Sequence, residues 1–280
     1  PGIYSANPRQ IPGARLLKKL DYEEAQEITS MGAKVLHPRC LTPLRTHGIP
    51  LHIKCTTRPD LAGTIITSDV RQAGAEVKAI SSKYGVTLIS MESIHMWQEV
   101  GFLSDIFGVF KQHGLSIDMI STSETNVTVS LDKIANALNP KILAQLCRDL
   151  EEFCKVRRIG PCAAVSLVGR DIRAILHKLG PALEVFAEPS IHLVSQAAND
   201  LNLTFVVDED QAERLVDQLH QLFFEHRGKG ALLGPTWSEV FEDKEREQTP
   251  RKRPWWRNRR DDLLALAAEE TPLYVYDEET

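Results

Sequence analysis

Apolar and polar residues follow one another between residues 85 and 150 in an order that predicts strands and helices. Strands are expected in "VTLISME", "LSIDMIS" and "NVTVSLD", of which the second and third alternate apolar with polar residues. A helix between the first two strands is predicted by Leu103, Ile106, Phe107 and Phe110, at positions i, i+3, i+4 and i+7. A second helix is expected in "PKILAQLCRDLEEF". This order predicts an α+β unit of antiparallel strands backed by helices on one face.

The same order returns between residues 163 and 224. Strands are expected in "AAVSLVG", "SIHLVSQ" and "NLTFVVD". Apolar residues at helical spacing predict two helices, the first from Ile172, Ile175, Leu176 and Leu179 and the second from Ala212, Leu215, Val216, Leu219 and Leu222. The repetition predicts two copies of one unit that pack on each other.

The first 68 residues have a different pattern. After a polar turn region, "DYEEAQEITSMGAKVLHP" places Ala25, Ile28, Thr29 and Gly32 at helical spacing, and Pro38 is expected to end the helix. A short strand is expected in "IPLHIKC".

The bend between two strands of the first copy is a candidate ligand site. Asp118 and Glu124 lie beside the hydroxyls of residues 121 to 123. A turn can be polar only because it faces solvent, but two carboxylates among hydroxyls can also hold a charged amine. In the second copy, His192 takes the place of Asp118 and Ala198 that of Glu124. Because the second copy does not keep the acidic pair, the fold does not require it, and a ligand role is favoured.

Composition narrows the function to small-molecule chemistry. At 280 residues, two or three packed units are expected. The net charge of −5 gives no general reason to expect binding to nucleic acid or membranes. No segment reaches the roughly 20 apolar residues that span a bilayer, and the first ten residues do not form a signal peptide. No two of the five cysteines have the two-residue gap of a zinc or redox motif, so we expect reduced thiols and a cytoplasmic protein.

Apart from Trp255 and Trp256, residues 242–262 are nearly all charged or proline, which predicts a linker. Within them, "RKRPWWRNRR" has the composition of a nucleic-acid patch. The linker interpretation is favoured, because the segment is short and follows an acidic run. A nucleic-acid-binding regulator is the lowest-ranked alternative.

Three passages resemble aspartate kinase: "PGIYSANPR", "GAKVLHPRCLTPL" and "GFLSDIFGVFKQHGLSIDMISTSETNVTVSLD". The resemblance implies that residues 1–70 are the C-terminal part of an α/β amino-acid kinase domain. It also implies that residues 80–155 and 160–232 are tandem ACT regulatory domains with a ferredoxin-like βαββαβ fold. The third passage is most similar to the lysine-sensitive class. The implied reaction is ATP-dependent phosphorylation of L-aspartate to 4-phospho-L-aspartate in lysine, threonine and methionine synthesis, with feedback inhibition by lysine.

The kinase resemblance implies a nucleotide site for ATP with Mg²⁺. Tyr4 would lie near the adenosine, Arg9 near phosphate, and Lys34 and Val35 would contact ATP. The family usually has aspartate where this chain has Asn7, which keeps the turn but loses a charge. The family's phosphate loop and aspartate-holding groups are not in this sequence, so no catalytic residue is assigned and the chain alone is expected to be inactive.

In the lysine-sensitive class, the effector lies between ACT domains of paired subunits, which implies a homodimer. The corresponding residues here are Met96, Phe102, Leu103, Ser116, Ile117, Asp118, Ser123 and Glu124. Amides at the start of "FLSDIFGVF" are expected to hold the effector carboxylate. Glu99 stands where a small polar residue is expected.

Residues 263–280 end in "TPLYVYDEET", which resembles the opening of diaminopimelate decarboxylase, a pyridoxal phosphate enzyme. A fused kinase and decarboxylase is therefore one expectation. The alternative from another class is a non-catalytic ACT-type sensor subunit. The sequence upstream of Pro1 distinguishes them, since a phosphate loop there favours the enzyme and a nearby start codon favours the sensor.

Overall fold

The computed structural model describes residues 2–33, 35–56, 58–70, 76–94, 99–133, 135–136, 138–175, 190–225 and 232–242. The chain divides into two units, Pro1–Trp237 and Ser238–Thr280. The second unit is described only through the end of helix α8 (Trp237–Glu242). The rest of the expected linker and the expected decarboxylase start at 263–280 lie outside the described residues.

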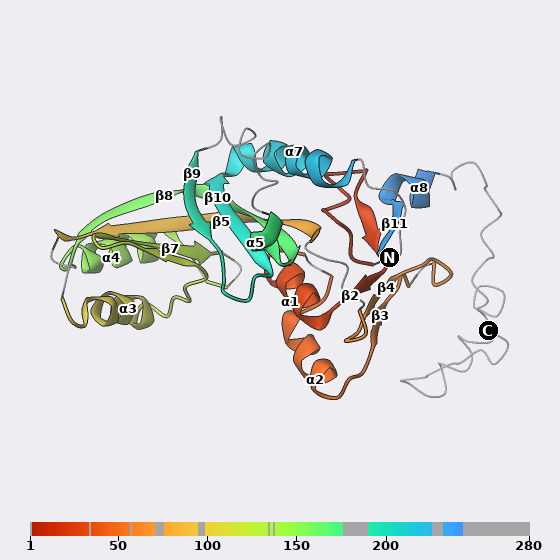
Figure 1. The fold of residues 1–280 in the computed structure, drawn as a ribbon. Helices are drawn as coiled ribbons and strands as arrows, with labels where there is room; N and C mark the ends of the chain where they lie inside the picture. Colours follow the sequence, from red (N-terminus) through yellow and green to blue (C-terminus); the bar gives the residue numbers. More distant parts are fainter. Residues whose placement is uncertain are drawn as a thin grey trace, which may run out of the picture. The chain divides into compact units, whose positions relative to one another are not determined.

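The centre of the first unit is an antiparallel sheet in the order β6-β7-β5-β8-β10-β9 (Figure 1). Its strands are β5 (Glu76–Glu92), β6 (Ile120–Thr122), β7 (Asn126–Asp132), β8 (Lys155–Arg170), β9 (Ile191–Ser195) and β10 (Asn202–Asp208). The two edge strands, β6 and β9, come close to each other. The sheet therefore curves and encloses one face, on which we define an inner cluster: Val86, Leu88, Met119, Cys162, Ala164, Leu193 and Val206.

The two long strands belong to both copies of the repeat. In the first copy, the second half of β5 pairs with β7 and with the start of β8. In the second copy, the second half of β8 pairs with β10 and with the start of β5. Each copy thus gains its fourth strand from the other long strand, which completes the ferredoxin-like βαββαβ order. The boundary expected between residues 155 and 160 lies inside β8.

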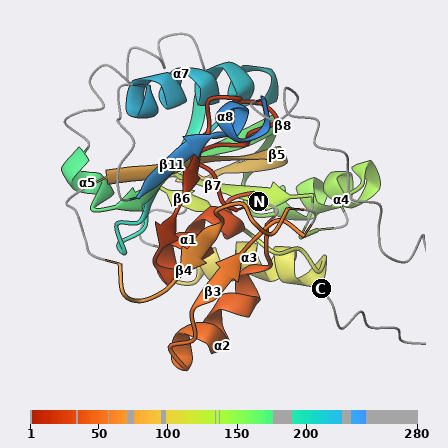
Figure 2. The same ribbon diagram turned by 90° about the vertical axis from the view of Figure 1, so that its right-hand side faces the viewer.

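Helices cover the outer face of each copy. In the first copy α3 (Phe102–Gln112) and α4 (Pro140–Leu150) pack on the sheet, and in the second copy α7 (Ala212–Phe224) does so. In both views α7 lies on one side of β5 and β8, whereas α3 and α4 lie on the other (Figure 1, Figure 2). The second copy also contains α5 (Ile172–Ile175) and the short helix η4 (Glu209–Gln211). The expected continuation of α5 to Leu179 lies outside the described residues.

The N-terminal piece shares a core with the second copy. It contains β1 (Arg15–Leu17), β2 (Lys19–Leu20), α1 (Tyr22–Ser30), η1 (Pro38–Cys40), α2 (Leu41–Thr46), β3 (Leu51–Ile53) and β4 (Thr64–Ile66). Strands β2, β4 and β3 form one sheet, and β1 pairs with β11 (Leu233–Thr236). None of the helices in the described ranges is long and apolar enough to cross a membrane.

The helix expectations are largely confirmed, and the ends of several elements are corrected. Helix α1 ends at Ser30 rather than at Pro38, because Gly32 has a φ of +120°, which an α-helix does not contain. The strand expected at 115–119 is irregular, and only Ile120–Thr122 forms β6. The alternation itself is confirmed, since Leu115 and Met119 are buried and Ser116 is exposed.

Candidate functional site

A cavity of about 600 Å³ lies between the N-terminal segment, the end of α1 and β5. Tyr4 and Arg9 line it from the N-terminal segment, and Val35 lines it after α1. The structure therefore brings together three of the four residues expected at a nucleotide site. The fourth, Lys34, lies outside the described residues.

Tyr4 lines this cavity, and its hydroxyl is buried. Its ring packs edge-to-face against Trp237, with 5.2 Å between the ring centroids, and its side chain is buried. Its hydroxyl has no hydrogen-bond partner among the described residues. Burial, with a smaller effect of Cys55, raises the pKa of Tyr4 to about 12. The hydroxyl thus stays protonated at neutral pH.

Asn7 maintains the turn that carries Arg9, as expected. The Asn7 Oδ1 accepts from the Arg9 amide at 3.2 Å, and its Nδ2 donates to Gln10 Oε1 at 3.2 Å. Arg9 is exposed. None of the described residues that line the cavity is Asp or Glu. The lining therefore suits an anionic group rather than a metal ion.

The wall of the cavity is fixed by close contacts between α1 and β5. A Cβ on Gly32 would lie 2.5 Å from the carbonyl oxygen of Ser82, so only glycine permits this approach. Ser81 Oγ donates to the Met31 carbonyl at 2.8 Å. Between the same two elements, the buried Glu24 of α1 forms an ion pair with Lys78 of β5 at 2.6 Å.

The residues expected to bind an effector lie on α3 and on the segment that follows it. Phe102 is buried in the core of the first copy, whereas Leu103 is exposed. The N-cap of α3, Gly101, makes no side-chain capping bond, so no N-cap side chain occupies the first-turn amides. Glu99 is exposed, and Met96 lies outside the described residues.

The segment 116–124 is held at both ends. Asn136, which sequence reasoning missed, accepts from the Ser116 amide at 2.6 Å and donates to the Ser116 carbonyl at 2.9 Å. At the other end, the Ser123 amide donates to the Asn126 carbonyl at 2.8 Å. The bend therefore spans only Ser123 to Thr125, because residues 121 and 122 belong to β6. Ile117 is half-buried, and Ser123 and Glu124 are exposed.

Asp118 already faces a cation within the protein. Lys83 Nζ lies 2.8 Å from Asp118 Oδ2 and 2.8 Å from Asp132 Oδ2. Burial alone would lower the pKa of Lys83, but hydrogen bonds and charge from the two carboxylates outweigh it and raise that pKa. The Asp118 side chain keeps 34% of its surface exposed, so it can accept a second donor. Sequence reasoning missed Lys83, which lies in the polar stretch "SSKYG" ahead of the expected strand.

The fold and the site indicate the class of protein to which the chain is similar. Residues 1–55 match the amino acid kinase family, and residues 89–138 match the ACT domain family. The fold is a mixed α+β structure in which a piece of an amino-acid kinase domain precedes an ACT domain.

Particular relatives are aspartokinases. Over 230 residues the chain is 32% identical to the lysine-sensitive aspartokinase 3 of Escherichia coli, a match that covers 80% of this chain and 50% of that protein. It is 30% identical to the chloroplastic aspartokinase 2 of Arabidopsis thaliana, over 80% of this chain and 42% of that protein. The structure is similar to E. coli aspartokinase III with aspartate and ADP, at 30% identity and a TM-score of 0.72, over 80% of this chain and 50% of that one. The chain is thus related to the aspartokinases and spans about half the length of these relatives.

Proposed function

We propose that the chain is part of an aspartokinase that phosphorylates L-aspartate to 4-phospho-L-aspartate with ATP and that senses lysine through its ACT copies. The observation that carries the proposal is the similarity to a lysine-sensitive aspartokinase across four fifths of the chain, through both the kinase piece and the ACT copies. One solved relative is E. coli aspartokinase III in complex with lysine and aspartate, with a TM-score of 0.67 to this structure. We propose that the protein acts in the cytoplasm.

The cavity at Tyr4 is proposed to hold part of the nucleotide. Tyr4 lines the cavity, and the exposed Arg9 can meet a phosphate oxygen. Bound Mg-ATP would supply the phosphoryl group, but the described lining has no carboxylate for Mg²⁺. These residues would therefore orient the nucleotide, and the groups for aspartate and metal are assigned to the rest of the enzyme.

Lysine is proposed to bind at Asp118 and Glu124. Their carboxylates are accessible to its ammonium groups, and the first-turn amides of α3 can donate hydrogen bonds to its carboxylate. Leu103 is exposed beside that turn, where it can cover the apolar stem, and Ser116, Ile117 and Ser123 belong to the same segment.

The effector site is proposed to lie in a homodimer of ACT domains. Three large apolar side chains are exposed on the two edge strands: Ile120 of β6, and Ile191 and Val194 of β9. Exposed apolar side chains on edge strands are usually covered by a partner. A second copy of this chain is the partner that fits the effector proposal.

Strand β5 is proposed to couple the two sites. Lys83 binds Asp118, and the neighbouring residues Ser81 and Ser82 contact the end of α1 at the cavity wall. A change at Asp118 would therefore reach the nucleotide cavity through Lys83, which also lines that cavity. Coupling between effector and substrate sites is typically about 1–3 kcal/mol.

Calorimetric titration with lysine, threonine and methionine tests the effector. The proposal expects heat from lysine and none from methionine. Heat from threonine alone, or from none of the three, contradicts the lysine assignment. The decarboxylase fusion and its pyridoxal phosphate stay a prediction, because the family matches at 1–55 and 89–138 do not reach residues 263–280.

A further inference from the structure

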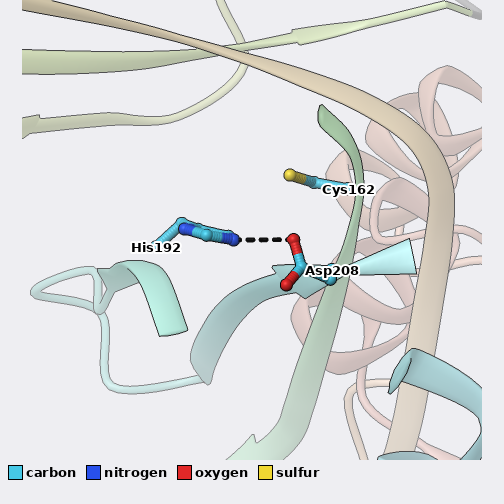
Figure 3. A group of neighbouring side chains, drawn as sticks. All are labelled: Cys162, His192 and Asp208. Atoms are coloured by element: carbon cyan, nitrogen blue, oxygen red, sulfur yellow. Dashed lines mark hydrogen bonds and ion pairs between the residues drawn. The ribbon is translucent and has the colours of Figure 1, made fainter. Parts of the chain in front are cut away.

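Three side chains that commonly bind metal ions meet in the second copy. Cys162 comes from β8, His192 from β9 and Asp208 from β10, and Figure 3 shows them pointing toward one another. Their ligand atoms all lie within 4.8 Å of one another. The His192 Nε2 lies 2.8 Å from Asp208 Oδ1. Three ligand types on three neighbouring strands are thus fixed by the sheet.

The backbone of β9 directs the side chain of His192 toward Cys162 and Asp208. Leu193 pairs with Val206 and Ile191 pairs with Val207, so His192 is the extra residue of a β-bulge in β9. Cys162 and Asp208 are direct partners in the register of β8 and β10. Bulges are frequent beside functional sites, because they redirect a side chain. The bulge here turns an edge-strand histidine toward the other two ligands.

In the first copy, the position equivalent to this cluster is occupied by the ammonium group of a lysine. Asp132 and Asp208 are the last residues of equivalent strands, and Asp118 corresponds to His192. In the first copy, the Lys83 ammonium lies between Asp118 and Asp132. The fold therefore places a positive charge at this position of the inner face.

The second copy replaces that lysine with an apolar residue. Strands β5 and β8 hold equivalent places in the two copies, and in their pairing Val86 of β5 lies opposite Cys162 of β8. On one side of this pair, Lys83 of β5 lies opposite Ala164, and on the other side Ile159 of β8 lies opposite Leu88. The counterpart of Lys83 is therefore Ile159, which packs against the inner cluster. The second copy keeps a carboxylate and gains an imidazole and a thiol, but it supplies no lysine at the matching position.

Electrostatics and access both favour a bound cation. Asp208 and Glu209 add negative potential at the buried Cys162 thiol. The side chain of Asp208 is 40% exposed and that of His192 is 21% exposed, so an ion can enter from solvent.

We propose that Cys162, His192 and Asp208 bind a divalent cation of the Zn²⁺ type. Thiolate, imidazole and carboxylate are the ligands that Zn²⁺ takes, usually in a tetrahedral set. Binding would release the thiol proton to solvent and replace the hydrogen bond between His192 and Asp208 with two metal bonds. The ion would tie β8, β9 and β10 together, as Lys83 ties the first copy.

Cobalt substitution tests this site in the full chain. After treatment with a chelator, titration with Co²⁺ is expected to give a thiolate-to-cobalt charge-transfer band that saturates at one equivalent and disappears on addition of Zn²⁺. The variants Cys162→Ala and His192→Gln should lose the band or bind at least tenfold more weakly. The matched control Cys154→Ala, which changes a thiol outside the cluster, should behave like the unchanged chain.

Several results would overturn the proposal. No charge-transfer band in the folded chain, or a band that persists in Cys162→Ala, would assign the cluster to an ordinary His–Asp pair. Because Cys162 is buried, thermal unfolding of His192→Gln provides a second measurement. Zn²⁺ should raise the Tm of the unchanged chain and leave that of His192→Gln unchanged, and equal shifts in both would also contradict the site. Neither result depends on lysine binding.

Discussion

Lys83 joins two carboxylates that come from different parts of the first copy. Its side chain is 10% exposed and that of Asp132 is 5% exposed, so this network lies largely away from solvent. Loss of one partner from such a network is costly, because a charge then stays buried with less compensation. Asp132 would bear most of this loss, since Asp118 faces solvent.

Lys83→Met is therefore expected to lower the free energy of unfolding by about 3 kcal/mol in urea denaturation. The control Lys133→Met removes an exposed lysine next to Asp132 in the sequence, and it should change the free energy by less than about 0.5 kcal/mol. Equal stability of the two variants would contradict the role given to Lys83.

His220 gives the fold a pH dependence. Its Nε2 lies 2.9 Å from Ser5 Oγ, its ring stacks on Phe224, and burial lowers its pKa. Because the unfolded state has the higher pKa, of about 6.5, it binds the proton more readily. The contribution of neutral His220 is fully present above about pH 6.5 and is lost as the pH falls through the lowered pKa of the folded state.

The free energy of unfolding is therefore expected to fall between pH 7.5 and pH 5, and to fall less in His220→Gln. Urea denaturation across this range measures the effect. His52→Gln, at an exposed histidine of β3, is the control and should keep the full pH dependence. The same slope in all three proteins would remove His220 from the explanation.

Single residues could be predicted from the sequence only where a resemblance or a comparison of the copies indicated them. Tyr4, Arg9 and Val35 line one cavity, and their contact with a nucleotide stays a prediction. The roles of Lys83 and Asn136 could not be predicted, because their partners are 35 and 20 positions away and are brought together by the sheet.

At the scale of elements, the helices could be predicted more fully than the long strands. Amphipathic spacing is a local property, and it correctly placed α3, α4 and α7. The first half of β5 was missed, because Lys78 and Ser81 are polar yet buried by partners in the N-terminal piece. The start of β8 was missed because its arginines, Arg157 and Arg158, are exposed and hide the strand pattern.

The contact between α1 and β5 depends on Gly32. Gly32→Ala would add a Cβ only 2.5 Å from a backbone oxygen, at a φ of +120°, so the end of α1 must shift. We expect a loss of about 1–3 kcal/mol in the free energy of unfolding, measured by urea denaturation. Gly13→Ala is the matched control, because nothing lies within 4 Å of its added Cβ. Equal values for both variants would contradict the close approach.

For the whole molecule, the order of a kinase piece and two repeated units could be predicted, but the sharing of strands could not. Strand register is set by pairing across the sheet, and each of β5 and β8 contributes one half to the first copy and the other half to the second. One consequence is that β6 and β9 remain the only edges of the described six-stranded sheet.

These edges give a prediction for assembly. Ile120→Lys places a charge on an exposed apolar position of β6, and it is expected to convert a dimer into a monomer in sedimentation experiments. Leu222→Lys, at a similarly exposed position of α7, should leave the dimer intact. A dimer that survives Ile120→Lys would place the interface elsewhere.

The central claim is that this chain senses lysine through Asp118. Its most direct test is the affinity of lysine for Asp118→Asn, measured by calorimetry beside Asp69→Asn, which changes an exposed carboxylate of the N-terminal piece. The account predicts that Asp118→Asn binds lysine at least about tenfold more weakly, because a charge-assisted hydrogen bond contributes about 1.5–3 kcal/mol, while Asp69→Asn binds as the unchanged chain does. Equal affinity of Asp118→Asn and the unchanged chain for lysine would contradict it.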